Sequence, residues 1–376
     1  MGASLMLRTM INAGDSTLLR DYLPPVYRKL LPGLFDAAIP RETRATCEDC
    51  VMCAKGAMPP GKDPLERKFF SPSTKCCTFH PSLPNFLAGA VLASVEPGME
   101  EGRRRLRAKI ERGIGVTPRG ILAPRKYSVL YEQGSEFFGR SEAMLCPYYD
   151  RGNCTIWLHR EAVCTTYFCK YERGVEGKEL WDELKRYLGV AELKLSLFAV
   201  TRLEQRPDRL ARIWDIWEHK GPVTHEEIEE RDISPERRSE IWGEWAGREE
   251  EFYLECHRTI EALDRASFEG LIGVDERFQR AKLEVSIAKV ISGELPARLR
   301  KNPELKAVRA GENYLCSVTR VGDAFEVNGL IFPLLEAFDG TQGYQSVLDE
   351  ISREKKIMLP LEIVTKLYHL GLLVAG

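Results

Sequence analysis

Cysteine is concentrated in one third of this chain, and this feature constrains the fold and the chemistry more than any other. Nine of the eleven cysteines lie between residues 47 and 169, where an even scatter would place about four. These nine are Cys47, Cys50, Cys53, Cys76, Cys77, Cys146, Cys154, Cys164 and Cys169. The set is odd in number and opens with C-x-x-C spacing, so it indicates metal ligation or redox chemistry rather than a disulfide framework. All nine are candidate metal ligands.

The nine cysteines form two groups that have to meet through folding. The first group is a C-x2-C-x2-C run that starts at Cys47 and continues at the adjacent pair Cys76-Cys77, and the second begins at Cys146. A spacing of two lets thiolates on a tight loop converge on one ion or on the corners of one cluster. We therefore expect one site or two adjacent sites. An iron–sulfur cluster such as 4Fe–4S, a structural zinc ion and metal-free redox cysteines all stay open, because thiolates suit each of them.

The segment from Cys154 to Cys164 carries the most specific motif of the chain. It reads C-T-I-W-L-H-R-E-A-V-C, with Cys146 before it and Cys169 after it. This arrangement resembles the CxxCxxCC cysteine-cluster family, also called YkgJ-like, which is described as zinc- or iron-chelating and is related to the flagellin lysine methylases. Two features depart from the family pattern: Glu161 replaces a proline, and the paired cysteines come later in the chain.

The resemblance covers residues 47–170 and implies a metal-chelating domain there. Arg160 occupies the arginine position of the family, where a guanidinium would offset negative charge on the thiolates. The relation to lysine methylases implies a post-translational group transfer, with S-adenosylmethionine as a candidate cofactor. Our first hypothesis is a metal-dependent modification or redox protein acting on a peptide or protein. The alternative is a non-enzymatic interaction module with structural zinc.

Hydrophobic periodicity and the positions of Gly and Pro predict a mainly α, overall α+β chain with four regions. Residues 1–45 are expected to form N-terminal helices, and residues 46–175 an irregular cysteine-rich metal-binding domain. Residues 176–296 form a helical middle, and residues 301–376 a small winged-helix-like α+β unit.

Helical periodicity places individual helices within this plan. We expect helices over residues 178–206, 208–220, 235–264 and 275–292, the third opened by the cap Ser234 before Pro235. The arginine-rich residues 100–112 predict a further helix, interpreted as a solvated charged face with an anionic partner as the alternative.

The C-terminal unit resembles the PqqD-like winged-helix domains, which recognise precursor peptides. The likeness lies in two alternating runs, in Phe338-Asp339-Gly340 after the first helix, and in a closing L-x2-L-G-L-L from Leu367. It implies a peptide or protein partner docked by strand addition beside residues 314–327.

Charge and motifs exclude several classes of protein. The net charge of −2 lacks the positive excess that phosphate contacts need, so nucleic-acid binding is disfavoured. The first residues lack a secretory signal pattern and no apolar run is long enough to span a membrane, which favours a cytoplasmic protein. Ala57 stands where a bacterial ferredoxin needs its fourth cysteine, and the first C-x2-C gap is too short for a radical S-adenosylmethionine enzyme.

Overall fold

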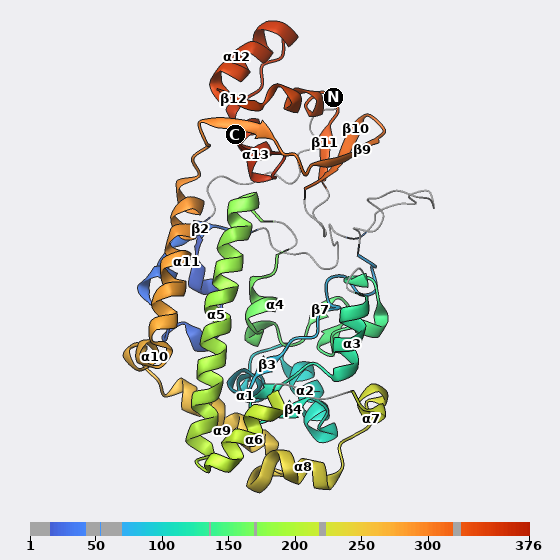
Figure 1. Cartoon of the computed structure of the whole chain (residues 1–376), viewed down its shortest axis with the longest axis vertical. Coiled ribbons are helices and arrows are strands. Elements are labelled where there is room, and N and C mark those ends of the chain that lie inside the picture. Colours follow the sequence, from blue (N-terminus) through green and yellow to red (C-terminus); the bar gives the residue numbers. More distant parts are fainter. Residues whose placement is uncertain are drawn as a thin grey trace.

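The computed structural model of the chain describes residues 16–42, 53, 70–134, 137–168, 171–217, 223–318 and 325–376. The described residues are mainly helical, with small antiparallel sheets of two or three strands (Figure 1). This confirms the predicted fold class at the level of mainly α and α+β. None of the helices in these ranges is long and apolar enough to cross a membrane.

Helix α5 (Gly174–Leu203) is 30 residues long and organises the part of the molecule before residue 293, which we call the body. Its buried side chains include Trp181, Leu184 and Leu188. The helices that pack against it are α1 (Asn85–Ala93), α4 (Ala162–Thr166), α9 (Glu249–Glu261), α10 (Arg265–Ile272) and α11 (Val274–Ser292). One hydrophobic core runs from the segment 16–42 to α11, so these stretches fold as one packed unit.

The α1–α9 contact is the closest helix pair of the body. Gly89 faces the main chain of α9, and a Cβ atom there would lie 1.9 Å from the carbonyl oxygen of Tyr253. Asn85, at the start of α1, donates through its side-chain amide to the carbonyl oxygens of Pro118 and Ser196. A glycine and a fully satisfied buried amide therefore let α1 pack deep in the core.

The N-terminal segment differs from the expected helices. Strands β1 (Ser16–Leu18) and β2 (Ala38–Pro40) pair antiparallel, and three short 3-10 turns lie between them. The turns are η1 (Leu19–Tyr22), η2 (Pro25–Tyr27) and η3 (Gly33–Asp36). Prolines between and within these turns remove main-chain donors and prevent a regular helix from propagating.

The cysteine-rich part of the body consists of short elements on two helices. Its helices are α2 (Glu100–Arg112) and α3 (Arg125–Gln133), with 3-10 turns η7 (Glu142–Met144) and η8 (Trp157–His159). Its strands are β3 (Leu83–Pro84), β4 (Val116–Thr117) and β5 (Gly120–Ile121) in one sheet, and the hairpin β6 (Tyr149–Asp150) with β7 (Asn153–Cys154).

Four further helical elements of the described ranges complete the body, and two of them, α7 and α8, begin at side-chain caps. They are α6 (Pro207–Trp217), α7 (His225–Glu229), α8 (Pro235–Trp242) and the turn η9 (Gly243–Trp245). The hydroxyl of Ser234 accepts from the main-chain N–H of Arg237, which confirms the predicted cap before Pro235. The single helix expected over 235–264 is wrong, however, because Gly243 has a φ of +58° and ends α8.

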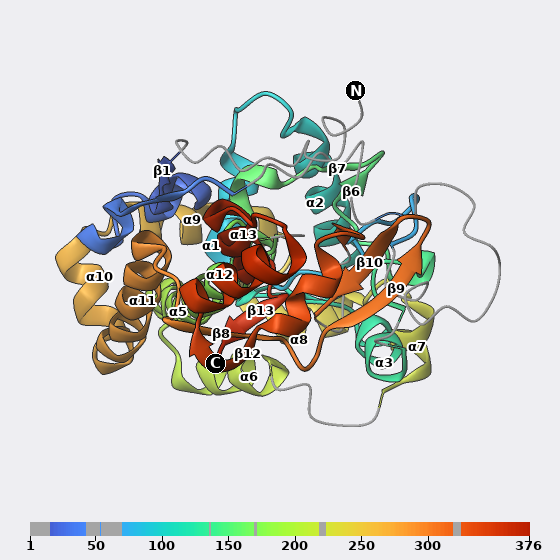
Figure 2. The same ribbon diagram turned by 90° about the horizontal axis from the view of Figure 1, so that it is seen from above.

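The C-terminal unit has a hydrophobic core of its own. Its elements are β8 (Arg298–Lys301), β9 (Lys306–Ala310), β10 (Asn313–Ser317), β11 (Phe325–Asn328), η10 (Phe332–Ala337), β12 (Asp339–Gly343), α12 (Tyr344–Lys355), α13 (Leu361–His369) and β13 (Leu373–Ala375). They form two three-stranded sheets, ordered β11-β10-β9 and β12-β8-β13. Seen from above, this unit covers the end of α5 (Figure 2).

The unit contacts the body at the first turn of α5. Gly174 has a φ of +53° and lies so close to the carbonyl oxygen of His369 that no side chain fits between them. Next to it, the Tyr368 hydroxyl donates to a carboxylate oxygen of Glu176 at 3.0 Å. The C-terminal unit is therefore fastened to the helix that follows the second cysteine group.

Candidate metal centre

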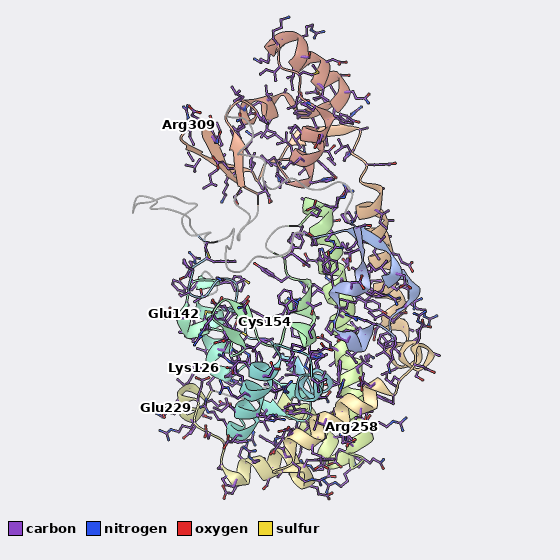
Figure 3. The ribbon with its side chains drawn as sticks, turned by 180° about the vertical axis from the view of Figure 1, so that it is seen from behind. Lys126, Glu142, Cys154, Glu229, Arg258 and Arg309 are labelled. Carbon is purple, nitrogen blue, oxygen red and sulfur yellow. The ribbon has the colours of Figure 1, made fainter. Side chains whose placement is uncertain are left out.

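Six of the nine predicted ligands lie in the described ranges. They are Cys53, Cys76, Cys77, Cys146, Cys154 and Cys164. Cys47, Cys50 and Cys169 lie outside the described residues. Figure 3 shows Cys154 at about the height of Glu142, in the half of the body nearer the C-terminal unit.

The pair Cys76-Cys77 lies in a turn that is hydrogen-bonded to Gly139 and to Cys146. The Thr74 hydroxyl donates to the carbonyl oxygen of Gly139 at 2.7 Å, and the Gly139 N–H donates to the Thr78 hydroxyl at 2.6 Å. The main-chain N–H of Cys146 donates to the carbonyl oxygen of Cys77 at 2.8 Å. This last bond brings the start of the second cysteine group against the pair from the first.

The hairpin of β6 and β7 returns Cys154 toward Cys146. Arg151 and Gly152, the two residues of its turn, have φ values of +45° and +95°, the backbone that a two-residue type I′ turn requires. Cys154 pairs with Tyr149, whose N–H donates to the carbonyl oxygen of Cys146 at 3.0 Å. The hairpin thus brings Cys154 back toward Cys146, which lies eight residues earlier in the chain.

Arg105 of the basic helix α2 holds this hairpin in place. Its guanidinium donates to the carbonyl oxygens of Pro147 (3.0 Å) and Tyr149 (2.7 Å) and pairs with Asp150 at 2.9 Å. The arginine-rich helix is therefore more than a solvated charged face, since one of its side chains satisfies the loop that carries two candidate ligands.

Cys164 is positioned by a helix cap at Glu161. The Glu161 carboxylate accepts from the N–H groups of Val163 (2.6 Å) and Cys164 (2.9 Å) and so begins helix α4. Arg160 donates to the carbonyl oxygen of Cys164 at 2.9 Å and stacks on the ring of Trp157. Glu161 thus gives helix α4 a defined start.

The described thiols share one neighbourhood. The Cys76 thiol, by hydrogen bonding, raises the pKa of Cys77, and burial and the charges of Cys146 and Cys154 add to this. Burial raises the pKa of Cys146 to about 12, with a further contribution from Cys154. The pKa of Cys164 is raised by burial, by Glu161, and by Cys146 and Cys154.

Cys53 extends this group, because it is buried with Phe70 in a small cluster against which Cys76 packs. The six described thiols are therefore gathered, yet within the described ranges no set of three or more His, Cys, Asp or Glu side chains is placed to hold a metal ion. Cys256 and Cys316 stand apart, each buried in a hydrophobic core.

Two half-buried cations flank the thiols, and the sequence pointed to only one of them. Arg160 interacts electrostatically with Cys154 and Cys164, as its sequence position suggested. Lys109, on α2, interacts with Cys146, and its pKa is lowered to about 8 by burial. Its ammonium lies 3.3 Å from Nε2 of His80, whose pKa is lowered to about 3, chiefly by burial and then by Lys109. The sequence does not single out Lys109 as a neighbour of the thiols, because it is one of many basic residues in its helix.

Comparison of the chain with family models, with curated proteins and with solved structures finds no match. The likeness to the cysteine-cluster family therefore rests on the motif around Cys154 and Cys164 alone. Chemically, neighbouring thiols that raise one another's pKa values form a donor set that a soft or borderline cation would convert to thiolates.

Proposed function

We propose that this chain is a metal-binding cysteine-cluster protein that holds an iron–sulfur cluster. The observation that carries the proposal is that Cys77 and Cys146, from the two sequence groups, lie against each other with four further thiols nearby. A purely apolar core needs no such gathering. The nine cysteines also exceed what one tetrahedral zinc ion uses.

The donor set fits an anionic metal–thiolate centre. Cys47, Cys50 and Cys169 would complete the ligands offered by the six described cysteines. Arg160 and Lys109, both half-buried, supply positive charge that would offset the negative charge of such a centre. When bound, the cluster would supply electron transfer or Lewis-acid chemistry, and the protein side chains would hold and orient it.

By resemblance, we extend the proposal to a post-translational modification or redox protein of the cytoplasm, where thiolates stay reduced. S-adenosylmethionine is a candidate cofactor by the same resemblance. The peptide or protein partner would add a strand to the β11-β10-β9 sheet of the C-terminal unit. Because β10 is the central strand, only the outer edges of β9 and β11 can accept it.

The second candidate is a non-enzymatic interaction module in which zinc staples the cysteine-rich region. It is favoured by the short elements there, two-residue strands and single turns, which gain most from a metal clip. The self-contained core of the C-terminal unit would then serve partner recognition.

Anaerobic purification with metal and sulfide analysis tests the proposal. We expect a brown protein with iron and acid-labile sulfide; a colourless zinc protein would favour the second candidate. Cys154→Ala and Cys164→Ala should lose metal together with thermal stability, because ligation energy is also folding energy. Cys256→Ser and Cys316→Ser are matched controls that should keep the metal content. A wild-type protein without metal, or full metal in both alanine variants, would refute the proposal.

A further inference from the structure

Helix α11 exposes an apolar stripe on the face opposite its buried side chains. Its inner face buries Leu283 and Ile287, among others. Its outer face presents Val274, Phe278 and Val285, which are 69, 59 and 58% exposed. A surface helix normally keeps its outer face polar, and contiguous exposed apolar surface marks an interaction site.

The stripe has the spacing of a coiled-coil seam. It consists of Val274, Phe278, Ala281, Val285 and Ala288, in alternating steps of four and three residues. Both alanines are exposed as well. Figures 1 and 2 both show α11 at the edge of the molecule, where a second helix can approach. Steps of four and three are the a and d positions through which two helices pack.

An open groove borders the stripe on the side of α5. Its volume is about 570 Å³, and it lies between Glu179 and Glu183 of α5 and Phe278, Lys282 and Val285 of α11. The stripe is therefore accessible along its length, and α5 adds a second wall against which an approaching helix can pack.

The order of large and small residues along the stripe is self-complementary. When two copies of α11 are aligned antiparallel, Phe278 faces Ala281 of the partner subunit, and Val274 faces Val285 of the partner subunit. Two-fold symmetry repeats each layer, so each large ring meets a small side chain and no layer is overfilled.

The charges beside the stripe match the same alignment. In this register Arg277 lies opposite Glu284 of the partner subunit, and Lys282 opposite Asp275 of the partner subunit. All four side chains are exposed, and Asp275 also lies 3.3 Å from Lys194 of its own chain. A parallel alignment would set Arg277 against Lys282 of the partner subunit, which is repulsive, and would keep one attractive kind of pair, Glu284 with Lys289 of the partner subunit, where the antiparallel alignment has two.

We propose that α11 is the two-fold interface of a homodimer, in which it pairs antiparallel with α11 of a second copy. The apolar seam provides the burial, and the two kinds of ion pair select the antiparallel alignment. The proposal is independent of the metal centre, because α11 contributes no candidate ligand.

A charge-reversal cycle on the full chain tests the dimer, with mass in solution measured by light scattering and sedimentation. The wild type is expected to be dimeric. Arg277→Glu and Glu284→Arg should each weaken dimerisation by about tenfold or more, since each creates two like-charge contacts. The double variant R277E/E284R should restore it, because the pairs reform with reversed sign.

Phe278→Glu should give a monomer with unchanged helical content, and Val95→Glu, at a site 89% exposed elsewhere on the body, should leave the dimer intact. A monomeric wild type at its highest soluble concentration would overturn the proposal. So would single reversals without effect, or a double variant that stays as weak as either single one, because another partner or another face would then have to cover the stripe.

Discussion

The main-chain N–H of Cys146 donates to the carbonyl oxygen of Cys77 at 2.8 Å. Sixty-eight residues of chain separate the two ends of this bond, yet it sets one candidate ligand of each cysteine group side by side. The bond uses only backbone atoms, so the register between the two groups depends on the surrounding fold and needs no metal ion. Substitutions that loosen this fold should therefore affect metal content without touching a thiol.

Arg105→Ala should loosen the hairpin that carries Cys154. The substitution leaves the carbonyl oxygens of Pro147 and Tyr149 without their charged donor, and we expect a loss of about 2 kcal/mol in the free energy of unfolding. Metal content should fall as well. Arg104→Ala is the matched control: Arg104 is 68% exposed and pairs with Glu101 at the surface, so its removal should leave the free energy of unfolding nearly unchanged. Equal effects of the two variants would refute the role of Arg105.

Gly89→Ala should separate α1 from α9. The added methyl group would lie 1.9 Å from the carbonyl oxygen of Tyr253, so the helices must move apart, at a cost of about 3 kcal/mol or more. The control Gly189→Ala, in α5, meets nothing within 4 Å and should stabilise by about 0.5–1 kcal/mol through helix propensity. Urea unfolding of both variants measures the difference, and opposite signs are expected.

Glu42 should make the protein less stable as the pH rises from about 4.5 to 7. Burial raises the pKa of this carboxyl from 4.5 to about 7, although it accepts from Trp181 Nε1 at 2.6 Å and from the N–H of Glu172 at 2.7 Å. Between these pH values Glu42 loses its proton in the unfolded chain but keeps it in the folded chain. The free energy of unfolding therefore falls by on the order of 3 kcal/mol.

Glu42→Gln removes the titration, and the stability profile of this variant should be flatter between pH 4.5 and 7. Denaturant unfolding at pH 5, 6 and 7 measures this, with Glu96→Gln on the exposed surface as the control. Identical slopes for the wild type and Glu42→Gln would contradict the assignment.

His159 should have the opposite effect at acid pH. Burial lowers its pKa from 6.5 to about 4, with a smaller contribution from His257. Both ring nitrogens are buried without a hydrogen-bond partner among the described residues. As the pH falls below 6.5, His159 takes up a proton in the unfolded chain, but in the folded chain it does so only near pH 4. The free energy of unfolding therefore falls by on the order of 3 kcal/mol.

His159→Met fills similar space without polar atoms. It should raise stability at neutral pH by about 1–3 kcal/mol, because unpaired buried nitrogens are costly, and it should reduce the loss at acid pH. Thermal unfolding at pH 7 and pH 5 checks both. A destabilised variant at pH 7 would show that the imidazole has a partner, such as an ordered water.

Several features of this protein could be predicted from the sequence because they depend on local spacing. Helix α5 (Gly174–Leu203) lies close to the predicted 178–206, since apolar periodicity over so many residues is a strong signal. The cap at Ser234 was predicted because a hydroxyl before a proline satisfies helix donors wherever the helix packs. The candidate ligands were identified by their enrichment, which needs no structure.

Other features were decided by tertiary structure, because their partners are distant in sequence. The sequence places Arg105 on a charged helix face, and only folding brings it to carbonyl oxygens that lie 42 and 44 residues later. The helix break at Gly243 follows from its positive φ, and the Arg209 guanidinium packs about 2.9 Å from where a side chain would begin. Lys109 comes to lie beside Cys146 only through folding.

The cysteines show both what the sequence determines and what the tertiary structure decides. Their identity and number determine that sulfur chemistry is available, because a thiol keeps its donor character in any fold. Which thiols meet depends on closing a long chain segment, and the cost of that closure is offset by nonlocal contacts such as the bond from Cys146 to Cys77 and the anchoring of the hairpin by Arg105. Spacing alone cannot encode these contacts, since each joins atoms that only the packed body brings within reach.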